Sequence, residues 1–187
     1  CNAVETDESL YERYLDGVSH AADELVARHS AALTLYLDGY LHDPGEAEDL
    51  MIEAFALLFV RERPICGGGC FRAYLYKTAR NLALRHLRRR RFRILPFEEL
   101  PFEPVSDALT EDALLSDQRR RTLWNALTRL KPEYREALYL VYFDGLDYRS
   151  TARVMGKNEQ QVTNLVHRGK QSLKKILEQE GFSYDND

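Results

Sequence analysis

Residues 71–93, FRAYLYKTARNLALRHLRRRRFR, decide how the rest of this chain is interpreted. Their first half predicts a helix, because apolar and small side chains recur at 3.6-residue spacing. The stripe consists of Phe71, Leu75, Thr78 and Leu82. Tyr76, Leu84 and Leu87 lie off this stripe, which predicts a helix covered on more than one side. The second half carries the guanidinium groups of Arg85, Arg88, Arg89, Arg90, Arg91 and Arg93. A folded domain does not bury so many unpaired cations, so they face solvent or a polyanion.

Charge alternates in blocks along the 187 residues, and the net charge of −4 hides this. Residues 1–60 carry 2 basic and 13 acidic side chains, whereas residues 61–93 carry 11 basic and 1 acidic. Residues 94–118 carry 7 acidic side chains and no basic one, and residues 119–175 carry 13 basic and 5 acidic. Two basic blocks separated by an acidic one indicate two anion-binding faces joined by a linker.

The composition is that of an ordinary globular protein, with 44% hydrophobic and 30% charged residues. The longest uninterrupted apolar run, residues 54–60, is far too short to span a membrane. No basic-then-apolar pattern at the start suggests a signal peptide. The 3 cysteines are an odd number, which argues against a disulfide framework. We therefore expect a cytoplasmic protein without membrane insertion.

The first sixty residues predict three amphipathic helices. The first is expected over Asp7–Asp16 and the second over Ala21–Tyr40. His29 lies on the apolar stripe of the second helix, where a core histidine with a hydrogen-bond partner is more common than a metal ligand. Asp43 and Pro44 predict the third helix start, with Asp43 as N-cap and Pro44 at the first helical position.

This third helix has an acidic face made of Glu46, Asp49 and Glu53, which lie within about 60° of one another. Three interpretations stay open. In the first, the face is a solvated surface, stabilised because its carboxylates lie near the helix N-terminus. In the second, it is part of a metal site for hydrolysis, which needs further ligands. In the third, it is a docking surface for a basic partner.

A glycine loop at Cys66–Cys70 precedes Phe71. A Cys-x3-Cys pair can hold zinc, but a structural site needs four ligands and no second pair exists. We therefore predict no metal and no cofactor, and interpret the glycines as allowing close backbone approach. Tyr74, Tyr76 and Phe92 alternate with basic residues beyond the loop, a pattern suited to stacking on unpaired bases while cations follow phosphates.

The second half predicts a linker and a helix-turn-helix. Residues 94–117 hold three prolines and seven acidic residues without sustained periodicity, which predicts a linker with a short helix near 108–116. The C-terminal domain is then expected over residues 118–187, and Pro132 opens its second helix. Ala152, Gly156 and Val162 have the spacing that two closely crossing helices and their turn require. The fold class predicted is all-α, with two small helical domains.

The second helix of this helix-turn-helix has an outward face suited to a major groove. Asp147 is expected to cap the first helix of the pair, and Asn158 with Gln161 to form a capping box for the second. The outward side chains are hydrogen-bonding or cationic: Gln160, Thr163, Asn164, His167, Arg168, Gln171, Lys174 and Lys175.

Two nucleic-acid elements on one short chain resemble the sigma factors of bacterial RNA polymerase, of the extracytoplasmic-function type within the sigma-70 family. The stretches DPGEAEDLMIEAFALLF (43–59) and FRAYLYKTARNLALRHLRRRR (71–91) resemble the first conserved domain, residues 1–93 here. The stretch from Leu127 to Lys175 resembles the second. The resemblance covers about residues 20–180.

The resemblance implies a promoter-specificity subunit without catalysis of its own, which binds core RNA polymerase and directs it to promoter DNA. Glu46, Asp49 and Glu53 would dock on the clamp helices of the large subunit, and the C-terminal domain on the flap of the other. The loop Ile65–Arg72 with Asn81 would capture a flipped base of the −10 element. An anti-sigma factor is left open as a further partner.

Two sets of DNA-binding residues follow from the same resemblance. Those implied for the −10 element are Arg72, Lys77, Arg80, Asn81, Arg88, Arg89, Arg90 and Arg91. Those implied for the −35 element are Gln160, Gln161, Thr163, Asn164, His167, Arg168, Lys170 and Lys174. Arg85, Ile52, Thr163 and Leu165 depart from the family pattern, and Arg85 stands where relatives usually have aspartate. These departures do not change the predicted class of protein, but they put the promoter sequence that it recognises in doubt.

Two other functions are compatible with parts of the sequence. A stand-alone helix-turn-helix regulator would bind duplex DNA without polymerase and use residues 1–93 for dimerisation or sensing. A metal-dependent enzyme would be built on Glu46, Asp49 and Glu53, but no second ligand cluster, phosphate-binding glycine motif or nucleophile–base pair accompanies them.

Overall fold

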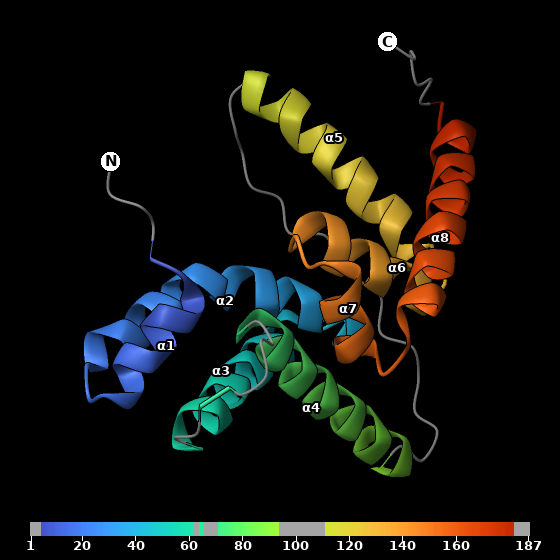
Figure 1. Ribbon diagram of the computed structural model, residues 1–187. Helices are drawn as coiled ribbons and strands as arrows, with labels where there is room; N and C mark the ends of the chain where they lie inside the picture. Colours follow the sequence, from blue (N-terminus) through green and yellow to red (C-terminus); the bar gives the residue numbers. More distant parts are fainter. Residues whose placement is uncertain (1–4, 62–63, 66–70, 94–110, 182–187) are drawn as a thin grey trace.

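A computed structural model describes residues 5–61, 64–65, 71–93 and 111–181. Its described residues form helices and no strand, in two groups that lie against each other (Figure 1). This confirms the all-α class. The N-terminal group consists of α1 (Asp7–Leu15), α2 (Ser19–Leu41), α3 (Pro44–Val60) and α4 (Phe71–Arg93). The C-terminal group consists of α5 (Glu111–Thr128), α6 (Pro132–Leu138), the π-helix η1 (Tyr139–Phe143), α7 (Tyr148–Met155) and α8 (Glu159–Gln179).

The helix starts predicted from local side chains are confirmed. Asp43 adopts an extended backbone and its carboxylate accepts the N–H of Glu46 at 2.9 Å. Asp147 caps α7 by accepting the N–H of Ser150. Asn158 and Gln161 form the reciprocal capping box of α8, with bonds of 2.8 and 2.9 Å. These caps satisfy N–H groups that the first helical turn leaves free.

The core of the N-terminal group confirms that α4 is covered on more than one side. Phe71, Leu75 and Leu82 of the predicted stripe are buried, and so is Tyr76, which lies off it. The ring of Tyr76 packs edge-on against Tyr36 of α2, with centroids 4.9 Å apart. One side of α4 therefore faces α2 and α3, and another side faces the C-terminal group.

Two features of the C-terminal group differ from the predictions. The helix α5 begins at Glu111, within the predicted linker of residues 94–117, so the short helix expected near 108–116 is the start of an 18-residue helix. The helix that Pro132 opens changes into a π-helix at Tyr139, which the sequence did not predict. Local propensity does not distinguish one π turn from α-helix, and such turns occur frequently at functional sites. Residues 94–110 lie outside the described part of the chain.

Gly169 allows α8 to cross α6 closely. It is buried, and a Cβ placed on it would meet two carbon atoms of Leu138 at 3.2 Å and one of Tyr134 at 3.3 Å. At such distances the side chains of Leu138 and Tyr134 would have to shift to accommodate even a methyl group, and further for a larger side chain.

We expect Gly169→Val to destabilise the C-terminal domain by about 1–3 kcal/mol, because the added methyl groups overpack the crossing. Thermal unfolding followed by circular dichroism measures the effect. Gln171→Val, on the exposed side of the same helix, is the matched control and should change the midpoint little. Equal midpoints for the two variants would contradict the close crossing.

Candidate nucleic-acid interface

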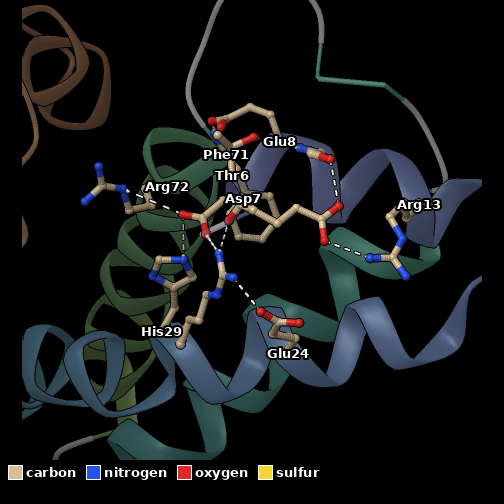
Figure 2. Close-up of polar contacts among 11 residues, drawn as sticks. Thr6, Asp7, Glu8, Arg13, Glu24, His29, Phe71 and Arg72 are labelled. Carbon is tan, nitrogen blue, oxygen red and sulfur yellow. Dashed lines mark hydrogen bonds and ion pairs between the residues drawn. The ribbon is translucent and has the colours of Figure 1, made fainter. Parts of the chain in front are cut away.

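The N-terminal helix α1 holds the first turn of α4 (Figure 2). Glu8 accepts a hydrogen bond from the backbone N–H of Phe71 at 2.8 Å, which satisfies a donor that the helix start leaves free. Phe71 is fully buried, and its ring lies 5.5 Å from that of Tyr11 and 5.8 Å from that of His29. These contacts fix the position at which the basic helix begins.

Asp7 lies at the centre of a cluster that joins α1, α2 and α4 (Figure 2). Its carboxylate lies 2.8 Å from Nε2 of His29, accepts from Arg28 at 3.1 Å, and lies 3.9 Å from Nε of Arg72. The hydrogen bond with His29 is the main cause of a lowered pKa for Asp7; it outweighs partial burial, and Arg28 adds to it. His29 is therefore a buried core histidine with a partner, as predicted.

We expect Asp7→Asn to destabilise the protein by about 1–2 kcal/mol at pH 7, because hydrogen bonds to a charged group are lost while the shape is kept. The pKa of Asp7 is lower in the folded chain than the unfolded value of 3.8. The stability that the ionised Asp7 carboxylate contributes is therefore fully present above the unfolded pKa and is lost as pH falls through the folded pKa. Urea unfolding at several pH values measures this. A gap between wild type and variant that stays constant into strong acid would contradict it.

The cations of α4 point in three directions instead of forming one patch. Arg72 and Arg80 are partly buried towards the C-terminal group, where Nε of Arg80 lies 2.9 Å from Glu136. Arg90 pairs with Glu46 of α3 at 3.5 Å, and His86 lies 3.3 Å from the same carboxylate. The remaining members of the predicted −10 set are exposed: Lys77, Asn81, Arg88, Arg89 and Arg91.

A groove with a volume of about 390 Å³ lies between the end of α3 and the exposed side of α4. Arg61 lies over the ring of Tyr74, 5.7 Å from its centroid, and donates a hydrogen bond to its hydroxyl. The α4 lining consists of Tyr74, Thr78, Asn81, Leu82 and Arg85. An aromatic face beside guanidinium and amide donors fits an unpaired base with its phosphate. Of the loop predicted to capture a base, residues 66–70 with both cysteines lie outside the described residues.

The exposed face of α3 combines acidic and apolar side chains. Asp49 and Glu53 are exposed, whereas Glu46 is half-buried in its contacts with α4. Ile52, between the two exposed acids, is 57% exposed, and Val60 at the helix end is 81% exposed. The predicted acidic face thus divides into Glu46, which contacts α4, and an exposed face of Asp49, Ile52 and Glu53, which is the candidate docking face. Within the described part of the chain no group of three His, Cys, Asp or Glu is arranged to hold a metal ion.

The turn between α7 and α8 has helix-turn-helix geometry. Gly156 takes the left-handed conformation at φ 65° that ends α7. Val162 is fully buried and Ala152 is 5% exposed, as the crossing of the two helices requires. The predicted motif is confirmed in these three positions.

All members of the predicted −35 set are exposed on α8. Gln160, Thr163, Asn164, His167 and Arg168 are exposed, and Gln160 donates to Asn164 at 3.4 Å. Gln161 is exposed too, but its side-chain oxygen is used in the capping box. Lys170 lies over the ring of Tyr142 at 4.6 Å, and Lys174 lies 3.8 Å from Glu178. The centre of the face therefore keeps amide, imidazole and guanidinium groups pointing outward.

An exposed basic helix and a helix-turn-helix on one chain define a DNA-binding protein of two helical domains. Two family models match these domains in order: Sigma-70 region 2 over residues 25–93, and Sigma-70, region 4 over residues 120–173. The RNA polymerase sigma-H factor of Pseudomonas aeruginosa is 30% identical over 183 residues, with 93% of this chain and 95% of the relative covered. The chain belongs to the sigma-70 family of RNA polymerase sigma factors, of the extracytoplasmic-function type.

A further relative agrees with this membership, and two solved structures share the fold. The extracytoplasmic-function sigma factor SigE of Mycolicibacterium smegmatis is 34% identical over 160 residues, covering 83% of this chain and 61% of the relative. The structure of CnrH in complex with the cytosolic domain of CnrY has a TM-score of 0.65 at 21% identity, with 93% and 98% of the two chains covered. That of RpoE with the anti-sigma factor NepR from Bartonella quintana has a TM-score of 0.65 at 19% identity, with 83% and 96% covered. These two likenesses concern the fold.

Proposed function

We propose that this chain binds core RNA polymerase through α3 and recognises two promoter elements, the −10 element through α4 and the −35 element through α8. Its class is that of a promoter-specificity subunit. The observation that supports the assignment of DNA-binding faces is that each family match contains an exposed helix face with amide and cationic side chains. These are Lys77, Asn81 and Arg88 in the first match, and Asn164 with Arg168 in the second.

The exposed residues of α4 suit a melted strand and those of α8 suit a duplex. The groove beside Asn81 offers an aromatic surface and cationic donors to a base taken out of the stack. The side chains of Asn164 and Arg168 have the donors and acceptors that read adenine and guanine edges in a major groove. Arg88, Arg89 and Arg91 would neutralise phosphates without reading sequence.

The docking face on α3 would meet the clamp helices of the large polymerase subunit, and the C-terminal domain the flap of the other. The combination of two carboxylates with the exposed Ile52 supports a protein partner, since interfaces join an apolar centre to a polar rim. An anti-sigma factor remains a candidate partner, because both solved relatives cited above are complexes, one of them with a protein named as an anti-sigma factor. The chain would act in the cytoplasm beside polymerase and catalyse no reaction itself.

A stand-alone helix-turn-helix regulator is not favoured, because the first domain also matches the sigma factor family. Co-purification of the chain with core RNA polymerase at low salt separates the two functions. Stoichiometric binding to core supports the proposal. A chain that stays free of core and binds duplex DNA tightly alone would contradict it.

A further inference from the structure

The groove between α3 and α4 is lined on its α4 side by a row of polar side chains. Tyr74, Thr78, Asn81 and Arg85 follow one another at intervals of three or four residues, which places them along one face of the helix. Arg61, the C-cap residue of α3, lines the groove from the other helix. The side chains of Arg61, Asn81 and Arg85 are exposed, so they can reach a ligand that enters the groove.

Helix α1 holds the end of α3 at which Arg61 lies. The hydroxyl of Tyr11 donates to the carbonyl of Leu58 at 3.3 Å, and that of Tyr14 donates to the carbonyl of Phe59 at 3.1 Å. These carbonyls belong to the last turn of α3, where a helix leaves acceptors free. The rings of Tyr14 and Phe59 also pack together, with centroids 4.7 Å apart. The backbone at Arg61 is therefore held in place before any ligand binds.

The side chain of Arg61 is held as well. It donates a hydrogen bond to the hydroxyl of Tyr74, and its guanidinium carbon lies 5.7 Å from the ring centroid. A guanidinium group carries five N–H donors, so most of them remain free to bind a ligand. Because the hydrogen bond goes to the hydroxyl, the guanidinium group lies towards that end of the ring and leaves ring surface for a flat base. Donors that are positioned in advance lose less entropy on binding than freely rotating ones.

The groove offers more hydrogen-bond donors than acceptors. The side chains of Arg61 and Arg85 have donors only. The hydroxyl of Thr78 donates to the backbone carbonyl of Tyr74 at 3.0 Å, so its proton is already used. The hydroxyl of Tyr74 accepts from Arg61 and keeps its own proton to donate. Asn81 adds one amide oxygen and two N–H donors. A base that presents acceptors to the groove is therefore favoured.

Guanine has the edge that fits this set of donors best. Its O6 and N7 are adjacent acceptors, and one arginine donates to both, whereas the same edge of adenine carries one acceptor and one donor. An unpaired cytosine also has adjacent acceptors, O2 and N3, but its single ring covers less apolar surface than the double ring of guanine. Leu57 and Val60, which are 45% and 81% exposed, line the groove beside Tyr74 and would be covered by the larger base.

We propose that the groove selects guanine as the unpaired base, and that Arg61 determines this selectivity by donating to O6 and N7. The inference rests on the proposed function, because it takes the groove beside Asn81 as the site of an unpaired promoter base, and it adds which base is bound. Arg85 has a different role. It lies one turn from Arg88 and Arg89, and it is exposed without a hydrogen bond or ion pair to the described residues, so it contacts the adjoining phosphate.

Arg61→Lys tests the proposal because it keeps the positive charge and removes the planar pair of donors. The ligands are fluorescein-labelled single strands in which one variable base lies between thymines. The variable base is guanine, hypoxanthine, 7-deazaguanine, adenine, cytosine or thymine. Hypoxanthine keeps O6 and N7, whereas 7-deazaguanine lacks N7. Fluorescence anisotropy at low salt measures the dissociation constant of the full chain for each strand. Arg121→Gln, which changes an exposed arginine of α5 outside the groove, is the control for Arg85→Gln.

For the wild-type chain we expect guanine and hypoxanthine to bind at least about fivefold more tightly than the other four bases, the lower limit for one bidentate arginine contact. Arg61→Lys should lose this preference and keep its affinity for the thymine strand within about twofold, because its charge is unchanged. Arg85→Gln should weaken binding of all six strands by a similar factor. Arg121→Gln should match wild type.

A wild-type chain with no preference, with a preference for cytosine, or with equal affinity for guanine and 7-deazaguanine would overturn the guanine selectivity. A preference that survives Arg61→Lys would overturn the role of Arg61, and a loss of guanine binding alone in Arg85→Gln would overturn that of Arg85. Circular dichroism checks that each variant keeps wild-type helix content. If Arg61→Lys unfolds, Tyr74→Phe replaces it, because loss of the hydroxyl that holds Arg61 should reduce the preference at least about twofold.

The oligonucleotide series contains no polymerase. A chain that fails to bind core would therefore reject the proposed function, while the series supports or overturns the guanine selectivity on its own data. A chain that binds core and shows no base preference would keep the proposed function and lose this inference.

Discussion

Reversing the two exposed carboxylates of α3, as Asp49→Arg with Glu53→Arg, is expected to weaken binding to core RNA polymerase by at least about 100-fold. The two side chains are exposed on one face around Ile52 and make no ion pair within the described residues. Placing positive charge against a basic partner surface costs several kcal/mol through like-charge juxtaposition. Fluorescence anisotropy of labelled protein titrated with core enzyme measures the dissociation constant.

The matched control places the same charge change elsewhere on the N-terminal group. Glu12→Arg with Asp23→Arg alters two exposed residues of α1 and α2. It should leave the dissociation constant within about threefold of wild type at moderate salt, because exposed charges beyond a Debye length are screened. Equal weakening by both double variants would mean that net charge, and not the docking face, governs binding. Glu46 is not reversed in this experiment, because its replacement would also remove the ion-pair partner of His86 and Arg90.

The second prediction with a large expected effect distinguishes residues that read the base sequence from residues that bind phosphate. Arg168→Ala should reduce discrimination between preferred and altered −35 duplexes by about 1–3 kcal/mol, which is about 5–150-fold, if its guanidinium contacts a base edge. Holoenzyme binding to a set of −35 variants measures this. Arg168 lies at the exposed centre of α8, where no hydrogen bond or ion pair within the described part of the chain holds it.

Arg88→Ala with Arg89→Ala should instead weaken holoenzyme binding evenly across promoter sequences. The slope of log affinity against log salt should become less negative by about 1–2, since each phosphate contact contributes about 0.7–0.9. Both residues are exposed on α4. Equal effects of the Arg168 variant and this pair on specific and random DNA would contradict the division between the two helices.

Local signals are sufficient to predict the helix starts that have a capping side chain. Asp43, Asp147 and Asn158 each cap a helix through a residue three positions on, and such contacts are written in adjacent sequence. The spacing of Ala152, Gly156 and Val162 likewise depends on one turn. Periodicity identifies the buried side of α4 because burial follows the helical repeat.

Contacts between distant segments cannot be predicted in this way. The partners of Glu136 lie 56 and 100 residues away, and nothing in the spacing of Arg80 distinguishes it from Arg88 or Arg89. The basic residues of α4 therefore predict one surface, whereas the helix turns Arg72 and Arg80 towards the C-terminal group and Arg90 towards α3, and leaves the others exposed. Glu46 and Asp49 share a face of α3 by angle, but only the first lies within reach of α4.

The proposed function makes one demand that no structural protein or stand-alone regulator meets: promoter-dependent initiation by core polymerase. Run-off transcription with purified core enzyme on a library of promoters randomised at the −10 and −35 elements tests it directly. We predict transcripts only when the chain is added, with selected templates sharing both elements at a fixed spacing. Transcription that is absent, or equal on all templates, would contradict the account.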